Sequence, residues 1–444
     1  MAYSKELEAL LKKAKAKPGD KIRVSVGGKT FEGVLLPRPE LGGENSNLIV
    51  RLANGYNAGV AFAKGMAVEK AGEAVKLESF PKLAVEKRND LPNISLIATG
   101  GTISSRVDYK TGGVYMLMSP EEILATVPEL ADVVSFKSIL SPFRKASEDM
   151  DHRDWGELAK ETANELNGGA DGVIVTHGTD TLGYTAAALS FMLRGLEKPV
   201  ALVGAQRSPD RGSFDGAMNL LCAARYAAGD VAEVAVVMHG SPNDDYCFAN
   251  VGTKVRKMHS ARRDAFRPVN CRPIEKIWPG GKHELLWTDF TRRGAGKVEA
   301  DVKFEEKVAL LKAHPGADPA LLDFLVGKNF RGVVLEGTGL GHFAVSSDRR
   351  NWMKSLKDAV GAGVSVCMTT QCLYGRVHES VYANLRKVSA AGVVFCEDML
   401  PETAFVKLGW VLGHEKRQDK AREMMLKNYA HEINGRLTEE DFLV

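Results

Sequence analysis

Two threonines, one aspartate and one lysine are the side chains of this sequence whose types and settings suggest chemistry. Thr102 ends the segment 99–102, Thr-Gly-Gly-Thr, and Thr179 and Asp180 lie in the segment 177–181, His-Gly-Thr-Asp-Thr. Lys257 lies in a polar segment further along the chain. A hydroxyl becomes a nucleophile when a base removes its proton, and a carboxylate or an amine can move that proton or bind a charged substrate. The same residues have ordinary roles too: threonine and aspartate cap helices, and a lone lysine is usually a solvated surface charge.

The elements that must position these side chains are strands. Residues 94–98 and 172–176 are short apolar runs, as expected of strands buried in a parallel sheet. In an open α/β sheet, ligands bind in the crevice at the carboxyl ends of the strands. The paired glycines at 100 and 101 let the backbone turn sharply and approach a ligand closely. A helix is expected after residue 181, so its free backbone N–H groups would favour an anion in the same crevice.

Strands and helices alternate from residue 93 onward, which is typical of a doubly wound α/β fold. We predict strands over 172–176, 200–204, 234–238, 332–336 and 364–369, and helices near 153–167, 181–195, 213–228, 347–360 and 403–413. Charged sequence with many Gly and Pro residues interrupts this alternation before residue 330. The sequence therefore predicts an α/β body of two doubly wound domains: 93–290, which holds the catalytic residues, and 331–444, which ends in a charged helical tail. A connecting segment, 291–330, joins them.

A different pattern precedes residue 93. Residues 4–17 have the spacing of a Lys-rich amphipathic helix, and short alternating segments with turn signals such as Asn54-Gly55 follow them. This pattern predicts a helix and a small β-barrel over 1–80. Polar residues over 81–92 are interpreted as a linker.

The composition limits the functional class. The chain has 444 residues, 44% of them hydrophobic, and a net charge of +3, which gives no argument for or against nucleic acid. No apolar run approaches the roughly 20 residues of a membrane span, so no membrane association is expected. Six cysteines without CxxC pairs indicate reduced thiols in a cytoplasmic protein without a metal site. His177, His239 and His342 fall near predicted strand ends and are interpreted as partners in local hydrogen bonds.

The motifs around Thr102, Thr179 and Lys257, in this order along the chain, resemble those of the bacterial-type L-asparaginase/glutaminase family. The resemblance spans residues 91 to about 420. It implies an asparaginase-like body in which Thr102 is the nucleophile beside a mobile lid and Thr179, Asp180 and Lys257 form a second catalytic triad. It also implies that Tyr109 orients Thr102 and that Ser147 and Glu148 bind the α-amino and α-carboxylate groups of the substrate.

This assignment fits the chemistry of amide hydrolysis. A nucleophile must attack the side-chain carbonyl before ammonia leaves, and the anionic intermediate needs nearby hydrogen-bond donors. A lysine, whose reference pKa is about 10.4, acts as a base only if burial depresses that value. Asp180 would oppose this depression, so its expected role is to bind the ammonium group of the substrate and orient Lys257. Either threonine could attack first; Thr102 is favoured as the covalent nucleophile.

Residues 19–57 resemble the leading domain of the D subunits of archaeal glutamyl-tRNA(Gln) amidotransferases. This resemblance implies a glutaminase that acts on glutamine or asparagine and delivers ammonia to a partner, the E subunit of the amidotransferase. The partner would use ATP and Mg to activate the glutamate of Glu-tRNA(Gln), and the assembly would be a homodimer of this chain within a heterotetramer. No cofactor is expected in this chain, which has no Walker A loop.

Two other functions are consistent with the same sequence. One is a free-standing L-asparaginase with an accessory N-terminal barrel, which would release ammonia without a partner. The other is a catalytically inactive scaffold that binds RNA through the barrel. The complete set of Thr102, Tyr109, Thr179, Asp180 and Lys257 argues against the scaffold.

Overall fold

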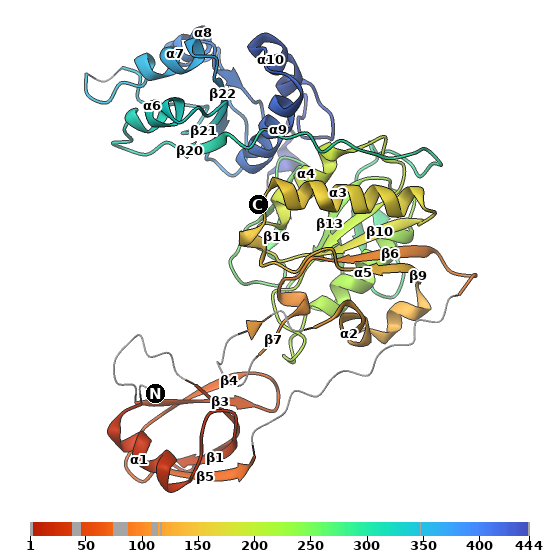
Figure 1. Cartoon of the computed structure of the whole chain (residues 1–444), viewed down its shortest axis with the longest axis vertical. Helices are drawn as coiled ribbons and strands as arrows, with labels where there is room; N and C mark the ends of the chain where they lie inside the picture. The colour runs from red at the N-terminus through yellow and green to blue at the C-terminus, as the bar shows by residue number, and fades with distance from the viewer. Residues whose placement is uncertain are drawn as a thin grey trace.

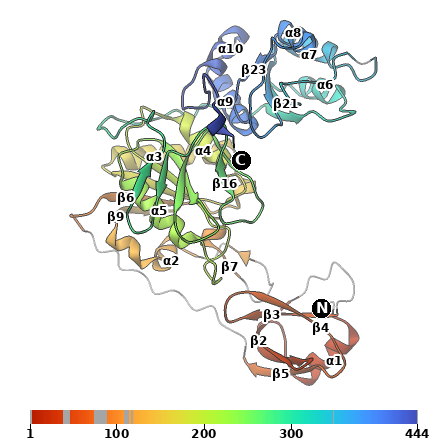
Figure 2. The same ribbon diagram turned by 180° about the vertical axis from the view of Figure 1, so that it is seen from behind.

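The structure is a computed structural model that describes residues 3–37, 46–73, 88–107, 114–115, 118–346 and 348–442. It has three parts along its longest axis (Figure 1). A small N-terminal domain lies at one end, a large α/β domain lies in the middle, and a smaller α/β domain lies at the other end. The view from behind shows the same order, and in both views the C-terminus returns to the side of the middle domain (Figure 2).

The N-terminal domain is one helix on an antiparallel sheet. Its elements are α1 (Lys5–Lys13), β1 (Lys21–Val26), β2 (Lys29–Leu36), β3 (Asn47–Leu52), β4 (Asn57–Ala61) and β5 (Ala67–Gly72). The Ser4 side chain caps α1, which buries Leu7 and Leu11 in one core with residues of the sheet such as Ile22. The strand order is β4-β3-β2-β1-β5, and the described edge strands β4 and β5 do not pair with each other. The predicted small strand-rich domain is therefore present, but its described strands do not close into a barrel, and α1 packs against the core of the sheet.

The middle domain is built on an eight-stranded sheet with the order β18-β17-β14-β13-β12-β10-β6-β9. Five of these strands are parallel: β9 (Ser135–Leu140), β6 (Asn93–Ala98), β10 (Gly172–Thr176), β12 (Val200–Val203) and β13 (Val234–His239). All of them except β9 were predicted as strands of a parallel sheet. The other three, β14 (Cys247–Val251), β17 (Glu275–Ile277) and β18 (His283–Leu285), are antiparallel. The connection from β13 to β14 is too short for a parallel crossover, so the chain returns antiparallel.

Helices and short ribbons complete the middle domain. The helices are α2 (Pro120–Ala125), α3 (His152–Asn167), α4 (Leu182–Met192) and α5 (Gly216–Ala228), with the 3-10 turns η1 (Thr102–Ser104), η2 (Pro128–Asp132) and η3 (Ser147–Asp149). The paired ribbons are β7 (Arg106–Val107) with β8 (Val114–Tyr115), β11 (Leu193–Arg194) with β19 (Glu299–Ala300), and β15 (Val255–Lys257) with β16 (Phe266–Pro268). A capping box between Asp151 and Asp154 starts α3.

The C-terminal domain has a parallel four-stranded sheet, β20-β21-β22-β23. Its elements are β20 (Val308–Lys312), α6 (Ala320–Gly327), β21 (Gly332–Gly337), α7 (Met353–Gly361), β22 (Ser365–Thr370), α8 (Ala383–Ala390), β23 (Val394–Phe395), α9 (Pro401–His414), α10 (Gln418–Leu426) and η4 (Glu439–Asp441). The segment 291–330, predicted as a connection, contains the strand β20 of this sheet and the helix α6 of the same domain.

The predicted charged tail packs on its own chain. Lys407 of α9 is fully buried and pairs with Glu432 of the tail at 2.5 Å. A second buried pair, Lys254 with Asp398 at 2.5 Å, joins the middle domain to the C-terminal domain. All six cysteines are free thiols. Among the described helices, none has the length and apolar character needed to cross a membrane.

Candidate active site

The Thr-Gly-Gly-Thr segment forms a turn that joins two strand ends. Thr99, directly after β6, donates its N–H (3.1 Å) and its Oγ1–H (2.9 Å) to the carbonyl of Thr176 at the end of β10. Gly101 has φ +82°, and a Cβ atom at this position would overlap the backbone of Gly178. Only glycine fits both constraints. The turn therefore places Thr102, the first residue of η1, beside the segment that carries Thr179.

Thr179, Asp180 and Lys257 meet directly. The Nζ atom of Lys257 lies 2.8 Å from Thr179 Oγ1 and 2.8 Å from Asp180 Oδ1. The side chain of Lys257 is 14% exposed and that of Asp180 is 67% exposed, so the carboxylate faces solvent and the amine lies below it. Lys257 is thus not a solvated surface lysine, because the ribbon of β15 and β16 carries it to the end of β10.

Thr179 and Asp180 are not the capping residues of α4. The N-cap position is Thr181, whose side chain makes no capping bond and donates instead to the carbonyl of Ser147 at 2.6 Å. The two residues before it are therefore available for another role.

Ser147 lies in the same place, and Glu148 follows it. Ser147 is buried, and a Cβ atom at Gly178 would lie 2.8 Å from its Cβ and Oγ atoms. The backbone N–H of Lys145 donates to Thr99 at 2.9 Å, which fixes this loop to the first turn. Glu148 is exposed beside Ser147. Tyr109 and part of the predicted lid lie outside the described residues.

His177 supports the site as a neutral ring. It is fully buried, and burial lowers its pKa from 6.5 to about 4, against the opposing effect of its bond to the Gly178 carbonyl. Nδ1–H donates to that carbonyl at 2.6 Å, so Nε2 accepts from the hydroxyl of Thr185 at 2.8 Å. This is the local hydrogen bonding predicted for His177. No group of three or more potential metal-binding side chains gathers within the described ranges.

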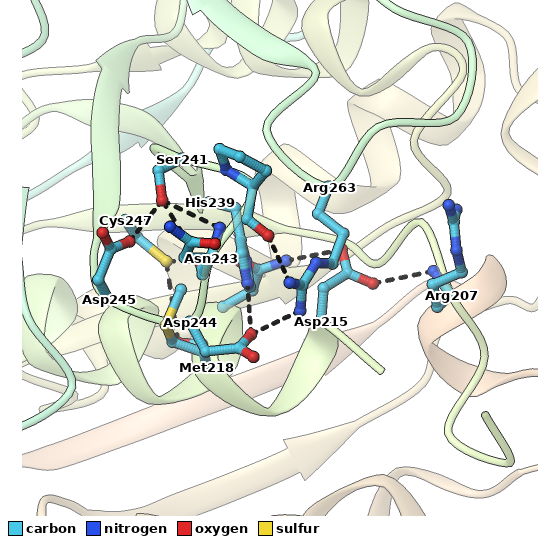
Figure 3. A network of polar contacts seen from close by, with 12 residues as sticks. Arg207, Asp215, Met218, His239, Ser241, Asn243, Asp244, Asp245, Cys247 and Arg263 are labelled. Atoms are coloured by element: carbon cyan, nitrogen blue, oxygen red, sulfur yellow. Dashed lines mark hydrogen bonds and ion pairs between the residues drawn. The ribbon is translucent and has the colours of Figure 1, made fainter. Parts of the chain in front are cut away.

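A second polar network lies at the ends of the neighbouring strands (Figure 3). Asp215, just before α5, accepts from the backbone N–H groups of Gln206 (2.9 Å) and Arg207 (2.9 Å). Burial raises the pKa of Asp215, while these N–H groups oppose the rise. His239 at the end of β13 contacts Asp244 at 3.1 Å, and Arg263 donates to the same carboxylate at 2.6 Å.

Local hydrogen bonding of His239 was predicted from the sequence, as observed here, but the rest of the network was not. Its residues are scattered over three loops and the end of β13, and no two of them form a recognisable motif. The one available signal was their position after predicted strands, which they share with many ordinary loop residues.

The assembled groups suit acyl transfer chemistry. The hydroxyls of Thr102 and Thr179 lie on adjoining turns. The Lys257 amine contacts the Thr179 hydroxyl, and the exposed carboxylate of Asp180 contacts the same amine. A hydroxyl next to a lysine can lose its proton when the amine is neutral, and the carboxylate can bind a cationic substrate. The arrangement therefore fits attack on a carbonyl of a substrate that carries an ammonium group.

Comparison with known proteins identifies the family of each part of the chain. Residues 93–290 match the family described as "Asparaginase, N-terminal", residues 307–425 match "Glutaminase/Asparaginase C-terminal domain", and residues 16–70 match "GatD N-terminal domain". Among solved structures, the thermostable L-asparaginase from Thermococcus kodakarensis covers 78% of this chain and all of its own, with a TM-score of 0.69 and 29% identity. L-asparaginase I from Vibrio cholerae has a TM-score of 0.65 and 27% identity, covering 78% of this chain and 99% of its own.

Relatives that also share the N-terminal domain are more similar. The D subunit of glutamyl-tRNA(Gln) amidotransferase from Pyrococcus furiosus is 52% identical over 99% of this chain and 100% of its own length. The proteins of the same name from Thermococcus kodakarensis and Methanopyrus kandleri are 52% and 44% identical, covering 93% and 98% of this chain and 93% and 95% of their own lengths. With this identity over nearly the whole of both chains, the protein belongs to the family of glutamyl-tRNA(Gln) amidotransferase D subunits, whose body has the L-asparaginase fold.

Proposed function

We propose that this chain is the glutamine-hydrolysing subunit of a tRNA-dependent amidotransferase. It hydrolyses the side-chain amide of glutamine, or of asparagine, and releases ammonia, with which a partner protein converts Glu-tRNA(Gln) to Gln-tRNA(Gln). The relatives named as D subunits of this enzyme and the asparaginase fold of the body support this role. The observation that carries the catalytic part is the contact of Lys257 with both Thr179 and Asp180 at 2.8 Å.

The proposed reaction has two stages. A threonine oxygen, that of Thr102 in our proposal, attacks the amide carbonyl, and the C–N bond breaks as ammonia leaves with a proton from the nucleophile. Water then hydrolyses the acyl-enzyme ester and returns the proton to the threonine. Lys257 accepts and returns protons through Thr179, the hydroxyl that it contacts.

Substrate binding is assigned to the residues around this centre. Asp180 is the exposed carboxylate of the cluster, so it binds the ammonium group of glutamine and orients Lys257. Ser147 and Glu148 bind the α-amino and α-carboxylate groups from the neighbouring loop, and Tyr109 orients Thr102 from the lid.

The proposal includes the assembly. The partner is the E subunit of the amidotransferase, and we place the ATP and Mg²⁺ that activate the tRNA-linked glutamate on that protein. This chain forms a homodimer within a heterotetramer in the cytoplasm. Such a glutaminase should not hydrolyse glutamine when no tRNA-linked glutamate is available. Binding of the partner and of tRNA should therefore raise its rate of glutamine hydrolysis by favouring the closed lid.

The test is steady-state ammonia release from glutamine and from asparagine. The chain is measured alone, with the E subunit, and with both the E subunit and Glu-tRNA(Gln). We expect the complete mixture to be at least tenfold faster than the chain alone. Equal rates with and without the partner would replace this proposal by the free-standing L-asparaginase. No hydrolysis under any condition would reject the catalytic role altogether.

A further inference from the structure

The N-terminal domain contacts the middle domain through the turn between β3 and β4. Gly55 in this turn has φ +79°, and a Cβ atom there would overlap the carbonyl of Asp210. The Gly212 N–H donates to the Asn54 carbonyl at 3.2 Å. The backbones of the two domains are therefore in direct contact along the loop 204–215, which follows β12.

Arg51 anchors this contact. It is the last but one residue of β3, and its side chain is 3% exposed although it extends from a small domain. The guanidinium pairs with the carboxylate of Asp210 and donates to the Asp210 carbonyl at 3.2 Å. Next to it, the hydroxyl of Tyr56 bonds to Ser213. The Arg51–Asp210 pair stabilises the domain contact, because removing one of the two charges would leave the other without a counter-charge.

The loop that Arg51 holds touches the catalytic threonine at its other end. A Cβ atom at Gly204 would lie 2.9 Å from Thr179 Cγ2 and 2.8 Å from the His177 carbonyl. Asp215, the last residue of the loop, accepts from the backbone N–H groups of Gln206 and Arg207 near its start (Figure 3). The loop is thus packed against Thr179 without space for an additional methyl group.

The same loop also contacts the turn that follows Lys257. Arg207 Nη1 donates to the carbonyl of Ala261 at 2.7 Å. Ala261 lies in the turn between β15 and β16, four residues after Lys257, and Met258 N–H closes this turn by donating to Ala265 at 2.7 Å. One loop therefore contacts both Thr179 and the turn that directly follows Lys257.

We propose that the docked N-terminal domain positions the Thr179–Lys257 pair, with Arg51 and Arg207 as positioning residues that act through the loop 204–215. The inference rests on the proposed function for its kinetic consequence. Shifts of the order of 1 Å in catalytic groups can reduce rates by about a hundredfold. A small change at the domain contact should therefore lower kcat, while the substrate-binding groups near Ser147 and the KM they determine change little.

The kinetic test uses the full chain in complex with the E subunit and Glu-tRNA(Gln). We expect Arg51→Met and Arg207→Met each to lower kcat for glutamine hydrolysis by about tenfold, with KM within about threefold of wild type. Arg207→Lys should restore much of the rate, because a lysine can also donate one hydrogen bond to the Ala261 carbonyl. The double variant should lose less than the product of the two single losses, since both residues act through one loop.

The matched control is Arg23→Met in the same domain. Arg23 also pairs with a carboxylate, that of Glu32 at 2.8 Å, but both side chains are about half exposed and lie within the N-terminal sheet. This variant should keep wild-type kcat. An unchanged kcat in Arg51→Met, or an equal loss in Arg23→Met, would overturn the proposal.

Hydrogen exchange followed by mass spectrometry provides a readout that does not depend on activity. In Arg51→Met, peptides from 204–215 and 258–265 should exchange faster than in wild type, whereas peptides from β1 and β2 should be unchanged. Unchanged exchange in 258–265 would reject the structural route even if the rate falls. If wild type hydrolyses no glutamine but the exchange pattern is as expected, the proposed function fails and the positioning route stands. Tyr56→Phe, which removes one hydroxyl, replaces Arg51→Met if that variant does not fold.

Discussion

The buried ring of His177 predicts a specific loss of stability in mild acid. Burial lowers its pKa from 6.5 to about 4, so between these values the unfolded chain binds a proton there and the native protein does not. The contribution of neutral His177 to the free energy of unfolding is therefore fully present above pH 6.5 and is lost as the pH falls toward 4. With these two values, His177 alone lowers the free energy of unfolding by about 2 kcal/mol between pH 7 and pH 5.

The comparison of wild type with His177→Gln isolates this contribution. Glutamine does not titrate in this range, and every other group, including the buried His239, contributes equally to both proteins. The free energy of unfolding should fall between pH 7 and pH 5 by about 2 kcal/mol more in wild type than in the variant. A general loss of stability in the variant does not affect the result, because the two pH dependences are compared.

The assay measures urea midpoints of the middle domain at each pH. After equilibration in urea, a short hydrogen-exchange pulse at one fixed pH labels peptides from 172–192, which include β10, His177 and α4. Slopes and midpoints give the free energy for this domain separately from the others. Parallel pH dependences in the two proteins would show that burial does not keep His177 neutral in the native protein.

Three further predictions concern other contacts. Asp180→Asn should lower kcat/KM for glutamine at least a hundredfold, because it removes the charge that binds the substrate ammonium and holds the catalytic lysine; a change within threefold would exclude this role. Lys407→Met should lower the urea stability of the C-terminal region by about 3–5 kcal/mol, since Glu432 stays buried without its cation, and adding Glu432→Gln should recover part of the loss; equal stability of all three proteins would contradict the buried pair. Gly101→Ala should reduce kcat at least tenfold, whereas Gly27→Ala, at another positive φ but with open space around it, should leave kcat unchanged; equal effects would mean that the close approach is unimportant.

The sequence predicted best those elements whose signals are local. The strand at 172–176 is an apolar run that ends in Thr176, and β10 has these bounds, with all five residues buried. The helix expected over 153–167 begins at His152, directly after its N-cap residue Asp151. Periodicity and capping residues act within a few positions of the chain, so they can be recognised without the fold.

Contacts between residues far apart in the chain were harder to predict from the sequence. The antiparallel strands β14, β17 and β18 are short and partly polar, and their direction follows from connection length and pairing with neighbours. Whether the N-terminal sheet closes into a barrel depends on how α1 and the edge strands β4 and β5 pack together, which no short segment of the sequence determines. The 2.8 Å contact between Lys257 and Thr179 bridges 78 positions, and only resemblance to a family connected them in advance. Arg51 is the one charged residue of the apolar strand segment 48–52, and an arginine there is normally interpreted as facing solvent, so its burial against Asp210 had no local signal.

The most direct test of the proposed mechanism is the effect of Lys257→Met on glutamine hydrolysis by the complex with the E subunit and Glu-tRNA(Gln). Methionine keeps most of the side-chain length but cannot take a proton from Thr179. We expect a loss of kcat of about 10³-fold or more, with unchanged urea stability and little change in KM. A variant that retains more than about a tenth of the wild-type kcat would remove Lys257 from proton transfer and contradict the central claim.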